Sequence, residues 1–223
     1  MSAKPTGLSE GRTRAAFCVL VLLLLSGCSS HLNNAFHLLF PKQSSLEQKA
    51  ADLPYASLLF VLDGRKGLVV MAYLAHDNSY FLASGQVSLT LKNGYLQQLG
   101  GTLPSLLMTQ VTQDNNLLTA PWQQAEVGIP VHYQVLREWR DADTQLHADR
   151  AQASLACTAA SPTKLALQTL PLQACTETLV WSNGKKTTST LWRNPTDKHL
   201  WRVQTQPWPG APSIEWQVAK AWW

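Results

Sequence analysis

The sequence predicts a mainly β fold, a curved antiparallel sheet arranged as a half-barrel or a sandwich, with a short N-terminal helix. Apolar and polar residues alternate over 87–92 and 131–139, which is the period of a half-buried strand. Asn-Gly pairs at 93–94 and 183–184 each lie between two apolar runs, and this dipeptide is a strong hairpin signal. The remaining apolar runs are short and bounded by turn residues, so long helices are not expected.

The elements follow in order along the chain. A helix is expected from Ser44 or Ser45, as its N-cap, to about Ala51, and Pro54 ends it. It is expected to lie across the concave face of the sheet. Residues 55–99 read as a β-meander of short strands joined by turns. Further strands are expected at 131–140, 146–157, 163–170, 176–181, 186–193, 199–204 and 214–220.

The N-terminus has the features of a secretory signal. Basic residues precede an apolar run at 15–25, and Leu25-Ser26-Gly27-Cys28 follows it. The run is about half of the roughly 20 apolar residues that a membrane-spanning helix needs. The last four residues resemble the lipobox of bacterial lipoproteins. That resemblance implies cleavage between Gly27 and Cys28, with a diacylglycerol and an N-acyl chain on Cys28; no other cofactor is expected.

The residues after the cysteine act as an address in such lipoproteins. An Asp directly after the cysteine commonly retains the protein in the inner membrane, whereas Ser29 and Ser30 stand here. The resemblance therefore implies an outer-membrane location, with the body facing the periplasm. The expected organisation is a cleaved signal at 1–27, a lipidated tether at 28–34 and one β-rich periplasmic domain at 35–223.

The charge balance gives no sign of a strongly anionic partner. The chain has 18 Lys and Arg against 14 Asp and Glu. Loss of 1–27 removes three basic residues and one acidic residue, so the mature chain would carry a net charge of +2. A nucleic-acid partner is not expected from so even a balance.

Two of the four cysteines remain in the expected mature body. Cys18 leaves with the signal and Cys28 takes the lipid, so Cys157 and Cys175 form an even pair in an oxidising compartment. We expect a disulfide, which would contribute about 3 kcal/mol in the chain-entropy treatment. The alternative is a pair of buried free thiols. A metal site is not expected, because two Cys without a His cluster do not make a zinc site.

No catalytic residues are predicted. The sequence has no HExxH pair and no GxSxG elbow. His147 lies near Asp141, Asp143 and Asp149 in the sequence, which could mimic a cation or acid–base site. The competing interpretation is a solvated turn.

All nine tryptophans lie from Trp122 onward. Core positions are expected for Trp181, Trp192, Trp201 and Trp216, which fall within strand patterns. Three others are candidates for glycan or partner contact. Trp208, between two prolines, is expected to be exposed, and Trp222 and Trp223 at the chain end could cover a sheet edge, contact a partner or meet the membrane interface.

Several blocks of the mature chain resemble the YjbF/GfcB family, and their order and spacing cover most of it. They are Leu53-Pro54-Tyr55-Ala56-Ser57, Val69-Val70-Met71-Ala72-Tyr73, Lys92-Asn93-Gly94-Tyr95, Leu99-Gly100-Gly101, Asn194-Pro195, Trp201-Arg202, Pro209-Gly210, Ile214-Glu215-Trp216 and Val218-Ala219-Lys220. The chain departs from the family at the cysteine pair, over 110–130, and at Asn194, where Asp is usual.

This family comprises outer-membrane lipoproteins tied to group 4 capsule and exopolysaccharide export. The resemblance implies a non-catalytic lipoprotein whose partners are an outer-membrane barrel, periplasmic export proteins and, as a further candidate, the polysaccharide itself. Two alternatives remain. A carrier of lipid or acyl chains would need an apolar cavity walled by Leu and Trp, and a polysaccharide-modifying enzyme would need two carboxylates facing each other in a cleft.

Overall fold

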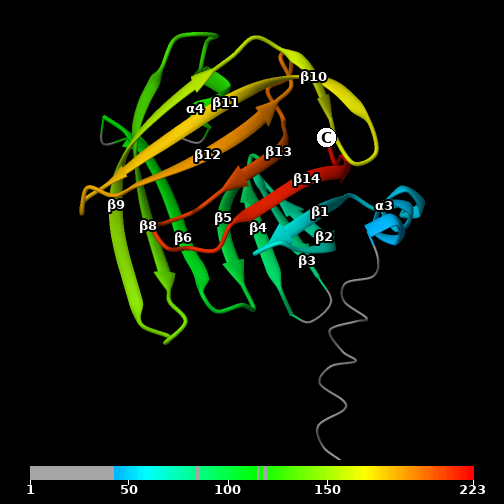
Figure 1. Cartoon of the computed structure of the whole chain (residues 1–223), viewed down its shortest axis with the longest axis horizontal. Coiled ribbons are helices and arrows are strands. Elements are labelled where there is room, and N and C mark those ends of the chain that lie inside the picture. Colours follow the sequence, from blue (N-terminus) through cyan, green and yellow to red (C-terminus); the bar gives the residue numbers. More distant parts are fainter. Residues whose placement is uncertain (1–42, 84–85, 115, 118–119) are drawn as a thin grey trace, which may run out of the picture. The chain divides into compact units, whose positions relative to one another are not determined.

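The computed structural model describes residues 43–83, 86–114, 116–117 and 120–223. The described chain is a curved antiparallel sheet with a short helix at its start, which confirms the predicted fold class (Figure 1). The helices are α3 (Gln43–Asp52) and α4 (Pro121–Gln124). The strands are β1 (Ser57–Leu62), β2 (Arg65–Ala75), β3 (Asn78–Leu82), β4 (Ser88–Lys92), β5 (Tyr95–Gly100), β6 (Ser105–Gln113), β7 (Asn116–Leu117), β8 (Val131–Arg140), β9 (Leu146–Cys157), β10 (Ser161–Lys164), β11 (Thr169–Trp181), β12 (Lys186–Arg193), β13 (Leu200–Thr205) and β14 (Ile214–Lys220).

The sheet closes on itself. The strand order is β11-β12-β13-β14-β1-β2-β3-β4-β5-β6-β8-β9, and β9 pairs with β11. These twelve strands of the described chain therefore form a ring, to which β10 and β7 add through β11 and β6. The sheet is therefore more completely closed than the half-barrel or sandwich that the sequence predicts. A closed ring of strands has no free edge.

The predicted Asn-Gly hairpin joins β4 to β5. Asn93 and Gly94 have φ values of +50° and +83°, the left-handed region that a type I′ turn requires. A Cβ added at Gly94 would also lie 3.1 Å from Cβ of Leu200, so glycine serves both the turn and the contact with β13.

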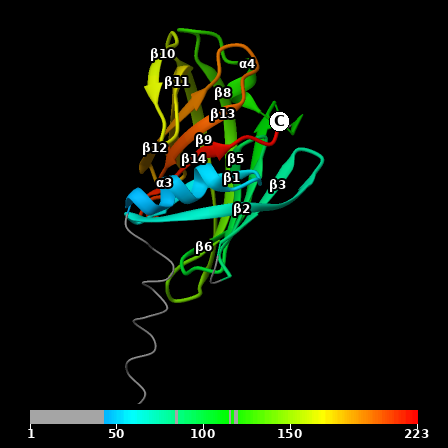
Figure 2. The same cartoon turned by 90° about the vertical axis from the view of Figure 1, so that its right-hand side faces the viewer.

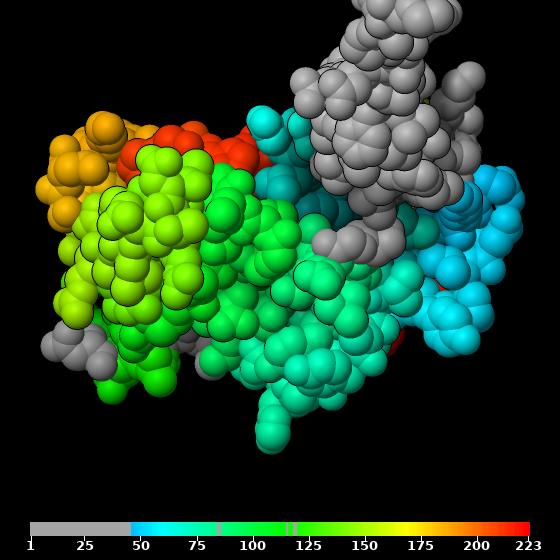
Figure 3. Space-filling model, turned by 90° about the horizontal axis from the view of Figure 1, so that it is seen from below, coloured from blue at the N-terminus to red at the C-terminus, as the bar shows by residue number. Residues whose placement is uncertain are grey.

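A ring of twelve strands is wider than side chains alone can fill, since about eight strands give an interior of that size. Two chain segments fold inward and supply the missing volume. At one end α4 places Trp122 in the interior cluster, and at the other the β13–β14 connection contributes Trp208. Figure 3 views the molecule from below, and in the part not covered by grey atoms the β8–β9 hairpin lies against its neighbours.

Helix α3 lies on the outer face of the barrel, so the expectation that it crosses the concave face was wrong. Leu58 and Phe60 of β1 belong to the interior cluster, whereas Leu59 points to the other face. Leu46 and Ala50 of α3 pack on Leu59 there, and Figure 2 shows the helix running alongside β1 and β2. The helix covers the apolar residue that the interior cannot reach.

The β10–β11 hairpin bends back over the outer face toward the same place. In Figure 1 its tip, in yellow, curves down beside β14 and the C-terminus. The backbone N–H of Ala166 donates to Oε1 of Gln217 on β14 over 2.8 Å, and Ala166 packs with the α3 cluster. Helix and hairpin tip thus approach one patch of the outer face from two sides.

Candidate functional site

The predicted lipidation site, Cys28, and the predicted cleavage at Gly27 and Cys28 lie outside the described residues. Within the described ranges, no helix is long and apolar enough to cross a membrane. The same part of the chain shows no group of three or more His, Cys, Asp or Glu placed to hold a metal ion.

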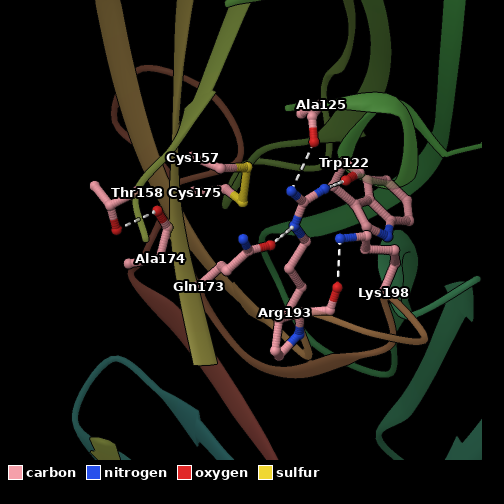
Figure 4. Close-up of a disulfide and its surroundings, with 10 residues drawn as sticks. Trp122, Ala125, Cys157, Thr158, Gln173, Ala174, Cys175, Arg193 and Lys198 are labelled. Carbon is pink, nitrogen blue, oxygen red and sulfur yellow. Dashed lines mark hydrogen bonds between the residues drawn. A yellow bond between two sulfur atoms is a disulfide. The ribbon is translucent and has the colours of Figure 1, made fainter. Parts of the chain in front are cut away.

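The expected disulfide is present and links two neighbouring strands of the barrel wall. Cys157 of β9 and Cys175 of β11 are direct cross-strand partners, and their sulfurs are bonded (Figure 4). These strands are neighbours in the ring, and only the short β10 lies between them in the sequence. The covalent bond therefore reinforces one pairing within the wall of the barrel.

Arg193 of β12 holds the α4 segment inside this end of the barrel. It is buried, and its Nε donates to Oε1 of Gln173 over 2.9 Å. Its two terminal nitrogens donate to the backbone carbonyls of Trp122 and Ala125, the latter over 2.6 Å (Figure 4). Burial lowers the pKa of Arg193, and the carbonyl acceptors compensate for the lost water.

Halfway along the barrel a second polar cluster crosses the interior. Glu177 of β11 is fully buried and accepts hydrogen bonds from the hydroxyls of Tyr95, at 2.8 Å, and Tyr133. Nη2 of Arg137 donates to the Tyr95 hydroxyl over 2.9 Å. Burial, followed by the negative charge of Glu177, raises the pKa of both tyrosines well above the ordinary value.

Arg137 also holds the β13–β14 connection, the second segment that folds into the barrel. Nη1 of Arg137 donates to the carbonyl of Pro207, and the Trp208 ring stacks on Trp139 with centroids 5.2 Å apart. Trp208 is only 4% exposed, so the expectation that it is exposed was wrong. Its flanking prolines do mark a connection between strands, but that connection folds into the barrel because the interior needs filling.

Glu177 has no second carboxylate beside it in the described interior. Glu177 is the one buried carboxylate of the described chain, whereas glycoside cleavage generally uses two that flank the substrate. Its hydrogen bonds go to wall residues of β5 and β8. We read the cluster as a structural network that joins β11 to β5 and β8 across the interior.

The acidic residues around His147 form an exposed turn. Nε2 of His147 and Oδ2 of Asp141 lie 2.7 Å apart, and the hydrogen bond from His147 lowers the pKa of Asp141. Asp141 Oδ1 accepts the backbone N–H groups of Asp143 and Gln145, while Asp149 accepts from the backbone next to it. The carboxylates serve the local backbone, which agrees with the solvated-turn interpretation.

The last two tryptophans cover part of one barrel end. Trp222 meets the buried Phe81 edge to face, with ring centroids 5.1 Å apart. Trp223 stacks on His199 at 4.4 Å and keeps 42% of its surface exposed. Contact of Trp222 or Trp223 with a partner or a glycan stays a prediction.

The space between α3 and the hairpin tip is a pocket of about 520 Å³, here called the outer-face pocket. Its lining combines apolar side chains with charged ones. The apolar members include Leu46, Leu59 and Leu165. The charged members are Glu47, Lys66, Lys164, Arg202 and Glu215.

Arg202 is the most constrained of these charged groups. Its guanidinium carbon lies 4.6 Å from the centroid of the Trp192 ring, and its Nε lies 2.9 Å from Oε1 of Glu215. Trp192 and Arg202 are cross-strand partners on β12 and β13. Trp192 and Arg202 are half-buried on the outer face, so the expected core position of Trp192 holds only in part. Trp201 is half-buried but packs against the interior cluster, and Trp181 and Trp216 are buried, as expected.

A larger depression, about 750 Å³, lies beside β4, β5 and β6. Its lining contains a single charged residue, Arg140. The outer-face pocket is smaller but brings five charged side chains together, and we therefore treat it as the candidate binding site. Sequence reasoning missed it, because its five charged members come from five separate elements.

Comparison with known proteins identifies the fold. No protein-family model and no curated protein sequence matches the chain. The crystal structure of the hypothetical lipoprotein YmcC from Escherichia coli K12 is similar, with a TM-score of 0.67 over 81% of this chain and 91% of that one. The two sequences are 16% identical. At that identity the likeness shows a shared barrel fold.

Proposed function

We propose that this chain is a non-catalytic outer-membrane lipoprotein that assists the export or assembly of an exopolysaccharide or capsule polysaccharide. It would be anchored through acyl chains on Cys28 and face the periplasm. Its partners would be an outer-membrane barrel, periplasmic export proteins and the polysaccharide. Its physical role would be to hold a binding surface close to the membrane.

The observation that carries this proposal is the filled interior. Trp122 and Trp208 occupy the space that a ring of twelve strands would otherwise leave empty, and Arg193 and Arg137 hold their backbones there. A carrier of acyl chains would need that space as a cavity, and a glycoside hydrolase of the usual kind would need a second carboxylate facing Glu177. A protein that binds its partner on the outer face of the barrel needs neither an interior cavity nor a pair of carboxylates.

Two further points support the proposal. The lipobox at Leu25-Ser26-Gly27-Cys28 resembles that of lipoproteins, and the fold resembles a protein whose name describes it as a hypothetical lipoprotein. Two or three acyl chains anchor a protein far more firmly than one. The link to polysaccharide export comes from the resemblance to the YjbF/GfcB family.

The proposal is tested in a strain that lacks the chain, by measuring polysaccharide released to the medium. Release should fall without the chain and return with the wild type, but not with Cys28→Ser, which should run as unprocessed protein outside the outer membrane. Cys18→Ser is the matched control, because it lies in the predicted signal and should restore release. Unchanged release without the chain would contradict the export role, and a Cys28→Ser protein that still fractionates with the outer membrane would contradict the anchor.

Copurification tests the partners. Detergent-solubilised outer membranes carrying a tagged chain should yield an outer-membrane barrel protein of the export machinery. Recovery of the chain without any export component would weigh directly against the proposed assembly.

A further inference from the structure

We propose that the outer-face pocket binds an acidic saccharide unit, taking its carboxylate on Lys66, Lys164 and Arg202 and its ring against the apolar lining. The inference deepens the proposed function and rests on it for the identity of the ligand as a saccharide. The three cations come from β2, β10 and β13, so the fold gathers them from distant parts of the sequence.

The charge balance of the pocket favours an anion. Glu215 is already paired with Arg202, which leaves Glu47 beside Lys66 and Lys164. In the described part of the chain, the ammonium groups of these two lysines make no ion pair or hydrogen bond, and both residues are exposed. An incoming carboxylate would therefore meet two lysines that do not have to break an existing contact.

Arg202 is held ready for a planar anion. The Trp192 ring covers one face of the guanidinium, and Oε1 of Glu215 lies 2.9 Å from Nε as an ion pair without hydrogen-bond geometry. A guanidinium fixed in this way loses little freedom when its remaining N–H groups bind a carboxylate side by side. Arginine rather than lysine at this position suits a bidentate contact.

The shape of the pocket favours a saccharide over a membrane surface. Its volume of about 520 Å³ falls within the roughly 300–1,000 Å³ that is usual for small-molecule sites. Leu46, Leu59 and Leu165 offer apolar contact to the C–H faces of a sugar ring. A lipid bilayer is flat and is usually met by a protruding basic patch, whereas these cations line a hollow in a nearly neutral body.

Calorimetry on the full lipidated chain in detergent tests the inference, with tetragalacturonate as the acidic probe and maltotetraose as its neutral match. Tetragalacturonate should bind at low ionic strength and weaken as salt is added, because screening shortens the reach of the lysine charges. Maltotetraose should bind at least about tenfold more weakly, the factor that corresponds to 1.4 kcal/mol.

Variants locate the binding. Lys66→Glu with Lys164→Glu should weaken tetragalacturonate binding by at least about tenfold. The control is Lys185→Glu with Lys186→Glu, which makes the same charge change on exposed lysines at the β11–β12 turn and should leave binding unchanged. Equal loss in both double variants, or no tetragalacturonate binding by the wild type, overturns the inference.

Two more outcomes separate the possibilities. If inorganic phosphate binds as tightly as tetragalacturonate and depends on the same lysines, the pocket is a phosphate or lipid-headgroup site, and the saccharide assignment is overturned. If polysaccharide release needs the chain but no acidic probe binds, the inference fails while the proposed function stands. If the wild type binds tetragalacturonate but polysaccharide release is unchanged in its absence, the binding site is supported and the export role is contradicted.

Discussion

The arginines inside the barrel and the arginine outside it are used in opposite ways. Arg137 and Arg193 are 1% exposed and spend their N–H groups on backbone carbonyls and wall side chains. Arg202, with 28% of its side chain exposed, is oriented by Trp192 and Glu215 beside an open pocket. Charge in the interior holds the chain in place, whereas charge on the outer face remains available to a ligand.

The largest expected effect is on the interior. Arg193→Met should leave the carbonyls of Trp122 and Ala125 without donors and lower the free energy of unfolding by about 3–5 kcal/mol. Arg150→Met, at an exposed position on β9, should change it by less than about 0.5 kcal/mol. Urea denaturation followed by tryptophan fluorescence measures both, and equal effects would show that Arg193 does not hold the α4 segment.

The disulfide comes next. Replacing both Cys157 and Cys175 by Ala should cost about 3 kcal/mol, since the unfolded chain then loses an 18-residue cross-link. The wild type under reducing conditions should show the same loss, and the double variant should not respond to the reductant. A variant as stable as the oxidised wild type would mean that the β9–β11 pairing needs no fastening.

Tyr133→Phe should have a smaller effect. It removes one of the two tyrosine hydroxyls that donate to the buried Glu177, and a weakened buried hydrogen-bond network costs about 1–3 kcal/mol. Tyr73→Phe, on the exposed surface of β2, is the control. Equal denaturation midpoints for the two variants would show that the hydrogen bond to Glu177 does not stabilise the fold.

The same cluster predicts sensitivity to alkali. Because burial and Glu177 raise the pKa of Tyr95 and Tyr133 in the folded barrel, both contribute stability below the unfolded value of about 10, and this stability is lost as the pH rises above it. Their phenolate absorbance should therefore appear only together with unfolding. If the Tyr95→Phe, Tyr133→Phe double variant lacks absorbance that the wild type gains while still folded, these hydroxyls are accessible and the assignment is wrong.

The smallest effect is expected on the outer face. Lys66→Ala with Lys164→Ala should change the free energy of unfolding by less than about 0.5 kcal/mol, because both residues are exposed and make no ion pair within the described ranges. A loss comparable to that of Arg193→Met would show that the outer-face pocket is part of the structural framework.

Local signals in the sequence predicted most of the strands and turns. Asn93-Gly94 marks its hairpin because the turn geometry selects those residues, and the pairing of Cys157 with Cys175 followed from counting cysteines. The pairing of β1 with β14, which joins the two ends of the described sheet and closes the barrel, was not predicted, because it depends on the curvature of the whole sheet.

No position was predicted for Arg193 or Glu177 and that of Trp208 was wrongly predicted, and the positions of all three have one cause. Arg193 and Glu177 have the same strand parity as the buried Leu191 and Leu179, so alternation points them inward, but charge argues for solvent. Trp208 appeared exposed because prolines flank it. In each case the width of the ring decides the position of the side chain. The wide interior is filled by chain segments that fold inward, and buried polar groups hold those segments.

The most direct test maps a ligand onto the nine indole N–H signals of the tryptophans by NMR. With tetragalacturonate added, the account predicts a shift for Trp192, beside Arg202, and unchanged signals for the interior residues Trp122 and Trp181. Shifts of Trp122 or Trp181 with Trp192 unmoved would mean that the barrel binds its ligand inside, contradicting the division between a filled interior and a binding outer face.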